Sequence, residues 1–456
     1  MKSVLLPLKL KFITGLSLIV LVSLTIMAFD IRKEDAGTKP EGINKVGHVV
    51  VIYMENHSFD CLYGEFEGAD GHANASAESV TQIDKDGNPY TYLPPIPKST
   101  AFPVNLPNNY FNIDQYVPAD QLTPDVTHRY YQEQLQINGG RMNRFAQYNR
   151  TKGLTMGYYK TSLLPLYPFA KQYTLCDRFF HSAFGCSFLN HQWLIAAATP
   201  VFPNAPQSMK VQLDSAGNLA KDGTVTPDGY VVNTGYSVNM PHPKGANPER
   251  LIPNQTAPTI GDRLSEKNVS WAWYSGGWND AIAGKPDPTF SYHHQPFIYF
   301  ANYADGTQAK KDHLKDETEF FEAARKGTLP AVSFVKPIGL ENEHPGHSDI
   351  HTGENHAVKL INAVLNGPNG KDAVIILTYD ENGGFWDHVA PPMIDKWGPG
   401  TRIPAIIISP FAKKGYVDHT QYETVSILSF IEKRWNLKPL NDRDKNANPL
   451  SNAFSF

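Results

Sequence analysis

The sequence predicts an α/β protein with a mostly parallel central sheet flanked by helices. Two segments, 49–54 and 373–379, are short and almost entirely apolar, and β-branched residues are frequent in both. This is the pattern of strands buried on both faces, as in parallel sheets covered by helices. Segments of strand and helix composition alternate along the chain, and that alternation favours one α/β domain with insertions.

The other elements follow from their composition. Helices are expected in part of 127–149 and in 190–198, 259–267, 317–325, 357–365 and 422–435. Further strands are expected in 269–274, 331–335 and 403–409, and segment 163–173 is expected to cover the sheet. The catalytic domain is assigned to 46–456, with insertions at roughly 64–126 and 203–300, the second forming a smaller cap or β-rich region.

The amino terminus has the pattern of an export signal. Lys2, Lys9 and Lys11 precede an apolar run over 12–29, and Asp30 ends it. We expect a signal peptide over 1–28, cleaved near Ala28, and a linker over 29–45. The protein is then exported to the periplasm or secreted. An uncleaved membrane anchor is the alternative, because the run is just long enough to span a bilayer.

Composition narrows the classes of function. The chain has 456 residues, of which 41% are hydrophobic, and a formal net charge of -4. That balance is typical of a globular protein and gives no bulk attraction to nucleic acid. The three cysteines are Cys61, Cys176 and Cys186. An odd number leaves at least one unpaired in an oxidising compartment, and their spacing does not predict a zinc site.

Acidic and amide side chains directly follow both apolar segments. Glu55 and Asn56 come after the first, and Asp380 and Glu381 after the second. Open α/β sheets bind ligands at the carboxyl ends of their strands. Adjacent carboxylates repel each other unless a cation lies between them, so we expect a shared metal site. The Gly383-Gly384 pair permits the sharp turn that such a site requires.

Ser187 is expected just before or within the first turn of a helix. Helix amino termini bind anions through their free N–H groups, although a capping role is the commonest one for serine. The neighbouring Cys186 is a rival nucleophile by residue type. A metal bound by oxygen ligands favours the serine oxygen.

Three motifs resemble a family of bacterial phosphoesterases that includes acid phosphatases and phosphatidylcholine-preferring phospholipases C. Residues 55–60 (ENHSFD) match its E-N-x-S-F-D signature, and residues 380–389 (DENGGFWDHV) match D-E-N-G-G-x-x-D-H-V. Residues 184–192 (FGCSFLNHQ) are similar to the nucleophile segment of the acid-phosphatase branch. The resemblance extends over 47–437.

The resemblance implies an alkaline-phosphatase-like fold and ester hydrolysis through a phosphoserine on Ser187. It implies one divalent metal ion, whose identity (calcium, magnesium, manganese or zinc) stays open. The implied metal ligands are Glu55, Asn56, Asp380 and Glu381. The histidines implied around the phosphoryl group are His128, His293, His294 and His344. Asp387 and His388 are interpreted as supports of the turn.

We therefore expect an exported, metal-dependent phosphoric-ester hydrolase, with a phosphomonoesterase (acid phosphatase) as the first choice. The alternative is a phospholipase C that contacts membranes transiently and binds a choline head group through an aromatic box. The aromatic residues available for such a box are Trp271, Trp273, Tyr274 and Trp278. A third hypothesis is a non-catalytic exported protein that binds phosphate or lipid. The sequence does not predict an oligomeric state.

Overall fold

An eight-stranded sheet forms the centre of the computed structural model, which describes residues 41–456. The predicted signal peptide and most of the predicted linker lie outside these residues. The strand order is β13-β4-β12-β11-β1-β10-β8-β9. The strands are β1 (His48–Met54), β4 (Thr174–Cys176), β8 (Trp271–Ser275), β9 (Leu314–Asp316), β10 (Val332–Lys336), β11 (Ala373–Tyr379), β12 (Ala405–Ile408) and β13 (Tyr416–Asp418). Every pairing in this sheet is parallel except the two made by β12. The predicted fold class is confirmed.

The two central strands fix the position of the loops that follow them. β1 and β11 pair in parallel, with Met54 opposite Tyr379. All of β11, and all of β1 beyond His48, is buried, as their unbroken apolar sequences predict. Because the strands end in register, Glu55 and Asp380 leave the sheet side by side.

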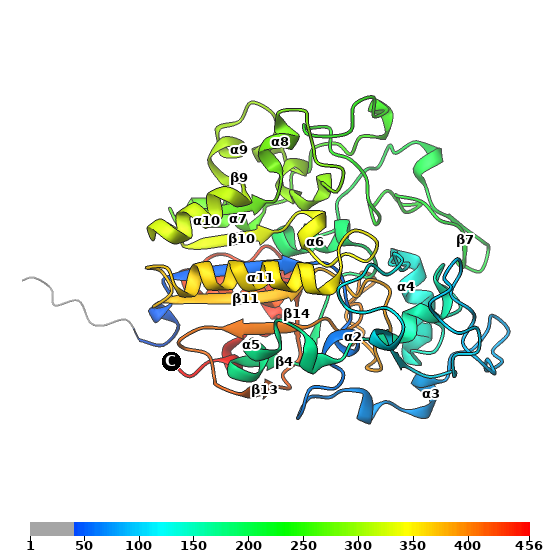
Figure 1. The fold of residues 1–456 in the computed structure, drawn as a ribbon. Helices are drawn as coiled ribbons and strands as arrows, with labels where there is room; N and C mark the ends of the chain where they lie inside the picture. Colours follow the sequence, from blue (N-terminus) through cyan, green and yellow to red (C-terminus); the bar gives the residue numbers. More distant parts are fainter. Residues whose placement is uncertain (1–40) are drawn as a thin grey trace, which may run out of the picture. The chain divides into compact units, whose positions relative to one another are not determined.

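Helices cover the sheet. In Figure 1, α11 (Ile350–Leu365) lies across β1 and β11, with α5 (Tyr167–Gln172) and α10 (Glu317–Lys326) to either side. A second group of helices consists of α6 (Ser187–Ala196), α7 (Ile260–Glu266) and α12 (Thr424–Trp435), in which α6 packs against the other two. The sheet is therefore the buried layer of an α/β arrangement.

Two predicted boundaries differ clearly from the structure. α11 begins at Ile350, seven residues before the predicted helix, because the Asp349 side chain caps it by accepting from the Thr352 N–H. The last helix, α12, begins at Thr424 because Tyr422–Glu423 forms the short strand β14. The first change places His351 and His356 on the helix.

The remaining elements are short. The helices are α2 (Phe59–Tyr63), α3 (Ala77–Val80), α4 (Tyr130–Ile137), α8 (Trp278–Ile282), α9 (Gln308–His313) and α13 (Asp442–Asn446). The strands are β2 (Phe111–Asn112), β3 (Gly157–Tyr158), β5 (Phe179–Phe180), β6 (Gln212–Leu213) and β7 (Leu219–Lys221). The expected insertion over 203–300 contains the small β6–β7 hairpin and also β8 of the main sheet. The domain limits stay predictions.

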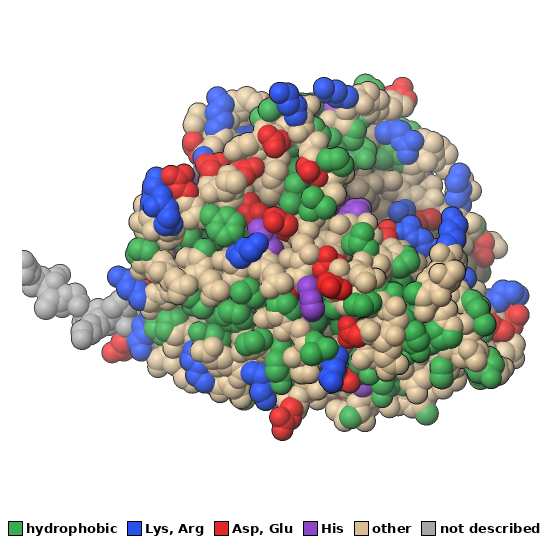
Figure 2. Space-filling model, viewed as in Figure 1, with side chains coloured by type: hydrophobic (Ala, Val, Ile, Leu, Met, Phe, Trp, Pro, Cys, Tyr) green, Lys and Arg blue, Asp and Glu red, His purple; other side chains and the backbone are tan. Residues whose placement is uncertain are grey.

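Three further features of the structure concern its surface charge, its cysteines and its helices. Figure 2 shows basic and acidic side chains interspersed over the face in view, with no extended patch of one charge. Cys61, Cys176 and Cys186 are all buried and unpaired with one another. Across residues 41–456, no helix has both the length and the apolar character needed to cross a membrane.

Candidate active site

The loops after β1 and β11 meet at the carboxyl edge of the sheet. Asn56 Nδ2 donates to Glu381 Oε1 at 2.7 Å, and the Asp380 N–H donates to the Met54 carbonyl at 3.1 Å. Glu55, Asn56, Asp380 and Glu381 are all fully buried. The four side chains that the motifs select as metal ligands therefore lie together, although more than three hundred residues separate the two loops.

The glycine pair shapes the second loop. Gly383 and Gly384 have φ values of +60° and +74°, in the left-handed region that favours glycine. A Cβ on Gly383 would overlap the carbonyl oxygen of Asn56, and one on Gly384 would overlap that of Thr127. The turn thus depends on glycine for its backbone conformation and for the close approach of the first loop.

Ser187 is the first residue of α6 and faces the carboxylates. Its Oγ donates to Glu55 Oε2 at 3.0 Å and lies 3.4 Å from Glu381 Oε1. Cys186 occupies the N-cap position, and its Sγ contacts the Val232 carbonyl at 3.5 Å. Burial raises the pKa of the Cys186 thiol, which disfavours the reactive thiolate. The serine is therefore the better placed of the two candidate nucleophiles.

The four predicted histidines surround these groups. His294 Nε2 lies 2.6 Å from Glu55 Oε1, and His344 Nε2 lies 3.9 Å from Glu55 Oε2. His128 Nε2 lies 4.0 Å from Glu381 Oε1. The ring of His293 packs edge-on against that of His294. Burial lowers the pKa of His128, and it lowers that of His294 to about 4. The lowered pKa values favour the neutral form of both rings at pH 7.

The other histidines of segment 341–356 lie at different distances from the site. His347 stacks on His344, with 4.6 Å between ring centroids. His356 instead bridges Glu317 and Glu341, at 3.0 and 3.3 Å, between α10 and α11. Of these histidines, His344 and His347 therefore lie near the carboxylates, and His356 lies in a separate ion cluster.

Two residues at the site were not predicted. Lys336, the last residue of β10, is fully buried, and its Nζ lies 2.9 Å from Glu55 Oε1. His191 lies one turn after Ser187 on α6, with its Nδ1 3.6 Å from Asp380 Oδ2. The sequence held a signal for each residue. Lys336 is a charged residue at the end of a buried strand, and His191 comes four residues after the candidate nucleophile.

The charges of the site are not balanced. Burial opposes ionisation of Glu55, but Lys336 and then His294 outweigh it and hold the pKa of Glu55 well below its usual range. Burial and the neighbouring carboxylates raise the pKa values of Asp380 and Glu381 well above theirs. One lysine therefore does not neutralise three buried carboxylates, and a further cation is needed for all three to ionise.

The residues present fit a divalent metal ion. Asn56 Oδ1 and Asp380 Oδ2 are buried without a hydrogen-bond partner among the described residues. One ligand atom each from Glu55, His191 and Asp380 lies within 4.8 Å of the others, and the same holds for Glu55, His293 and His294. The oxygen donors suit calcium, magnesium or manganese, and the histidines also admit zinc. The identity of the ion stays open.

A buried ion network holds the two loops together. Arg402 donates from Nε to Asp387 Oδ1 at 2.8 Å and from Nη2 to Asp60 Oδ1 at 3.1 Å. His388 Nδ1 lies 2.7 Å from Asp60 Oδ2. Asp60 ends the first motif, and Asp387 and His388 belong to the second. Arg402 and His388 together pair with the two carboxylates and link the first motif to the second, as expected for supports of the turn.

The proposed aromatic box is wrong. Trp271, Trp273, Tyr274 and Trp278 are all buried. Trp271 and Trp273 both pack on Phe297, and Tyr274 packs on Phe320. Alternate residues of a buried strand point to opposite faces of the sheet, so residues 271, 273 and 274 contribute to the core on both faces. They do not present a surface to a head group.

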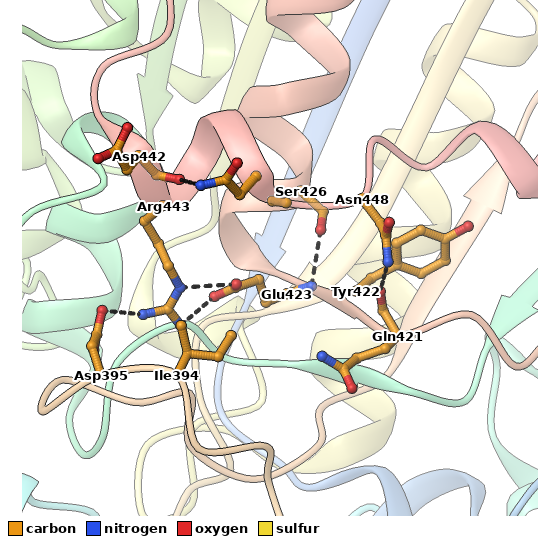
Figure 3. Close-up of a pocket in the computed structure, with 11 residues that line it drawn as sticks. Ile394, Asp395, Gln421, Tyr422, Glu423, Ser426, Asp442, Arg443 and Asn448 are labelled. Carbon is orange, nitrogen blue, oxygen red and sulfur yellow. Dashed lines mark hydrogen bonds and ion pairs between the residues drawn. The ribbon is translucent and has the colours of Figure 1, made fainter.

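A cavity of about 300 Å³ lies apart from this centre, between the start of α12 and α13. Figure 3 shows Arg443 in its wall, between Asp395 and Glu423. The arginine donates to Asp395 at 2.7 Å and to both oxygens of Glu423 at 2.9 and 2.6 Å. Its charge is therefore neutralised, and none of the motif residues lines the cavity.

Buried carboxylates, a serine at a helix amino terminus and a ring of histidines on one edge of an α/β sheet define a hydrolytic type of site. Residues 46–438 match the model of the Phosphoesterase family. The chain belongs to this family and is a hydrolase of phosphoric esters.

Several relatives are similar over most of the chain. It is 25% identical to phospholipase C A of Mycobacterium tuberculosis, over 92% of this chain and 79% of that protein. It is 24% identical to non-hemolytic phospholipase C of Burkholderia pseudomallei, over 91% of this chain and 59% of that protein. A solved structure from the alkaline phosphatase superfamily, from Vibrio parahaemolyticus, matches with a TM-score of 0.35 at 9% identity. It covers 72% of this chain and 75% of that one.

Proposed function

We propose that this protein is a metal-dependent phosphodiesterase of the phospholipase C type. The observation that carries the proposal is the similarity to proteins named phospholipase C over more than nine tenths of the chain. This similarity favours the phospholipase C, which was the alternative predicted from the sequence, over the first choice, the acid phosphatase. The substrate is then a phospholipid or a related phosphodiester, and the protein would contact membranes transiently.

The proposed reaction begins at Ser187. Its Oγ attacks the phosphorus while its proton passes toward Glu55 Oε2, 3.0 Å away. The bond from phosphorus to the leaving alcohol breaks, and the phosphoryl head group stays on Ser187. The amino terminus of α6 places free N–H groups beside the phosphoryl oxygens and favours their charge.

The histidines act on the alcohol and on the phosphoryl oxygens. His128 and His344 border the carboxylates from one side, with ring centroids 5.4 Å apart, and either ring, in its protonated form, can deliver a proton to the leaving alcohol. His293 and His294 hold equatorial oxygens. A water molecule then attacks the phosphoserine and gives its proton to the histidine that protonated the alcohol. The bond from phosphorus to Ser187 Oγ breaks, Ser187 regains its proton from Glu55, and the phosphorylated head group leaves.

Glu55, Asn56, Asp380 and Glu381 would hold the metal ion. When bound, a divalent ion supplies charge neutralisation at the phosphoryl group and makes Ser187 more acidic. Lys336 fixes Glu55 in its ionised form from the side of β10. The same ion would let Asp380 and Glu381 lose their protons.

A phosphomonoesterase is the second candidate. Residues 184–192 around Ser187 favour it, since they are similar to the acid-phosphatase branch. Hydrolysis of p-nitrophenyl phosphate, bis(p-nitrophenyl) phosphate and p-nitrophenylphosphorylcholine by one preparation separates the two. We expect the diesters to have the higher kcat/KM. Turnover of the monoester alone would favour the second candidate.

The third hypothesis, a non-catalytic binding protein, predicts no turnover of any ester. Wild type and Ser187→Ala would then be equally inactive and would bind the same phosphate ester alike. Export remains a prediction from residues 1–28, and mass measurement of the mature amino terminus in the producing cell would test it.

A further inference from the structure

We infer that a basic pocket beside the candidate active site binds a second anionic group of the substrate. The preferred phosphodiester would then carry a further phosphate or carboxylate on its head group. This inference deepens the proposed function and rests on it. The basic pocket is lined by Lys244, Arg250, Asn247, Thr224, Thr234 and Tyr236, among others.

The charged residues that line the basic pocket, Lys244 and Arg250, are both positive. The cavity measures about 450 Å³, and no aspartate or glutamate lines it. Lys244 and Arg250 are exposed, and their side chains make no ion pair with the acidic residues of 41–456. Threonine and asparagine side chains add hydrogen-bond donors. Two unpaired cations in a concave surface attract an anion and repel a quaternary ammonium.

The segment that leads into one wall of the basic pocket packs beside the start of α6. The Val232 carbonyl accepts from Cys186 Sγ at 3.5 Å, immediately before Ser187. Asn233 Oδ1 accepts from the Tyr130 N–H at 3.3 Å, two residues after His128. The next residue, Thr234, lines the pocket. The segment that contacts the amino terminus of α6 therefore also forms the wall of the basic pocket.

A second contact joins the basic pocket to the histidines. The ring of Tyr236 packs edge-on against that of Tyr292, with 5.6 Å between centroids. His293 and His294 follow Tyr292 directly in the chain. A substrate whose phosphoryl group lies at Ser187 can thus extend along Thr234–Tyr236 into the pocket. A volume of about 450 Å³ is within the range that accommodates a small polar head group.

The chain provides a matched control elsewhere. A second cavity, of about 490 Å³, lies on the outer side of α10 and α11 and also contains two basic residues and no acidic one. Its basic residues are Arg325 and Lys359, and no motif residue lines it. The two cavities agree in size and charge and differ in position. Only the first adjoins the active site.

The kinetic test compares dihexanoyl phosphatidylinositol with dihexanoyl phosphatidylinositol 4-phosphate below their micellar concentrations. We expect wild type to show at least a tenfold higher kcat/KM for the phosphorylated lipid. That corresponds to about 1.4 kcal/mol, which is modest for a charge-assisted contact. Lys244→Met/Arg250→Met should bring the ratio near one by lowering kcat/KM for the phosphorylated lipid. Arg325→Met/Lys359→Met should retain the wild-type ratio.

A binding measurement separates this inference from the proposed function. Ser187→Ala protein is titrated with glycerophosphoinositol 4-phosphate and with glycerophosphoinositol, with and without the two pocket substitutions. Tighter binding of the phosphorylated compound, lost with Lys244 and Arg250, supports the pocket even if wild type hydrolyses neither lipid. The inference is overturned if both compounds bind alike, or if the pocket substitutions change neither the binding difference nor the kinetic ratio.

Discussion

At the scale of single residues, the proposed chemistry depends most on Ser187. Replacing it by alanine removes the only hydroxyl that contacts both Glu55 and Glu381 among the described residues. We expect Ser187→Ala to lower kcat by about 10³-fold or more, because the attacking atom is lost. Steady-state hydrolysis of a phosphodiester measures this, with the melting temperature as a check on folding.

Cys186→Ala is the matched control for Ser187→Ala. The thiol is buried next to Ser187 but lies against the Val232 carbonyl. We expect this variant to keep kcat within about threefold, since no reacting atom is removed. If Cys186→Ala abolished turnover and Ser187→Ala did not, the assignment of the nucleophile would be reversed.

Lys336 leads to a prediction about stability. It is the buried cation beside Glu55, and removing one partner of a buried ion pair costs about 3–5 kcal/mol. We expect Lys336→Met to lose stability of that order in chelator and less with excess divalent metal, because the metal also neutralises Glu55. Urea unfolding under both conditions measures the difference. Lys315→Met, near exposed Glu319, should change stability by less than about 1 kcal/mol.

The sequence predicted some residues of the site and missed others. Glu55, Asn56, Asp380 and Glu381 were predictable because they directly follow two recognisable buried strands. His191 and Lys336 were not, because local sequence does not show which distant carboxylates they contact. Only the strand order, which places β10 next to β1, shows that Lys336 reaches the same carboxylates. Pairing between distant strands is not visible in local sequence patterns.

At the scale of the elements, the turn after β11 is the least tolerant of change. We expect Gly383→Ala to destabilise the protein by more than about 2 kcal/mol and to weaken metal binding, because its Cβ would overlap the Asn56 carbonyl. Gly139→Ala is the control, since Gly139 has a similar φ of +64° and open space around its Cβ position. It should cost only about 1 kcal/mol of backbone strain. Equal effects of the two substitutions would show that the close approach of the loops is unimportant.

The contact between α10 and α11 should depend on pH. Burial opposes charging of His356, but its hydrogen bond to Glu317 and its ion pair with Glu341 outweigh burial and raise the pKa of His356 to about 9. The protonated ring therefore stabilises the fold fully below pH 6.5. This contribution is lost as pH rises from 6.5 to 9, because the unfolded chain releases the proton first. The loss amounts to at most about 3 kcal/mol.

His356→Gln tests this contribution. Free energies of unfolding, measured in urea at pH 6 and pH 9.5, should fall more steeply with pH for wild type than for the variant. The variant removes the titrating group and keeps a hydrogen-bond donor near Glu317. Parallel pH dependences for the two proteins would exclude His356 as the group responsible.

At the scale of the whole molecule, the alternation of strands and helices predicted the α/β class, and the buried segments predicted the central strands. The shorter parts were not predicted. β9 has three residues and α8 has five, too few for a periodic pattern to be read. The irregular segments between residues 64 and 126 are held by side-chain contacts, such as Asn108 with the Gln82 and Tyr90 carbonyls. Such contacts exist only in the folded chain.

The whole fold should be coupled to metal binding. The sheet brings Glu55, Asp380 and Glu381 together in a buried space, where Lys336 alone does not balance them. An ion that binds only the folded state adds about 2.7 kcal/mol of stability at a hundredfold excess over its Kd. We therefore expect a chelator to lower the melting temperature of wild type. Titration with calcium, magnesium, manganese and zinc should restore it, most effectively with the ion that fits.

The double variant Asp380→Asn/Glu381→Gln isolates that coupling. It keeps the size of both side chains but removes two of the three negative charges that attract a cation. The introduced glutamine has one acceptor oxygen for the two donors that contact Glu381, Asn56 Nδ2 and the Gly383 N–H. Folding of the variant no longer brings three carboxylates together without enough positive charge to balance them. Its melting temperature in chelator should therefore equal or exceed that of wild type. It should also respond little to added metal. A wild-type melting temperature that neither chelator nor any of the four ions changes would refute a metal at this edge of the sheet.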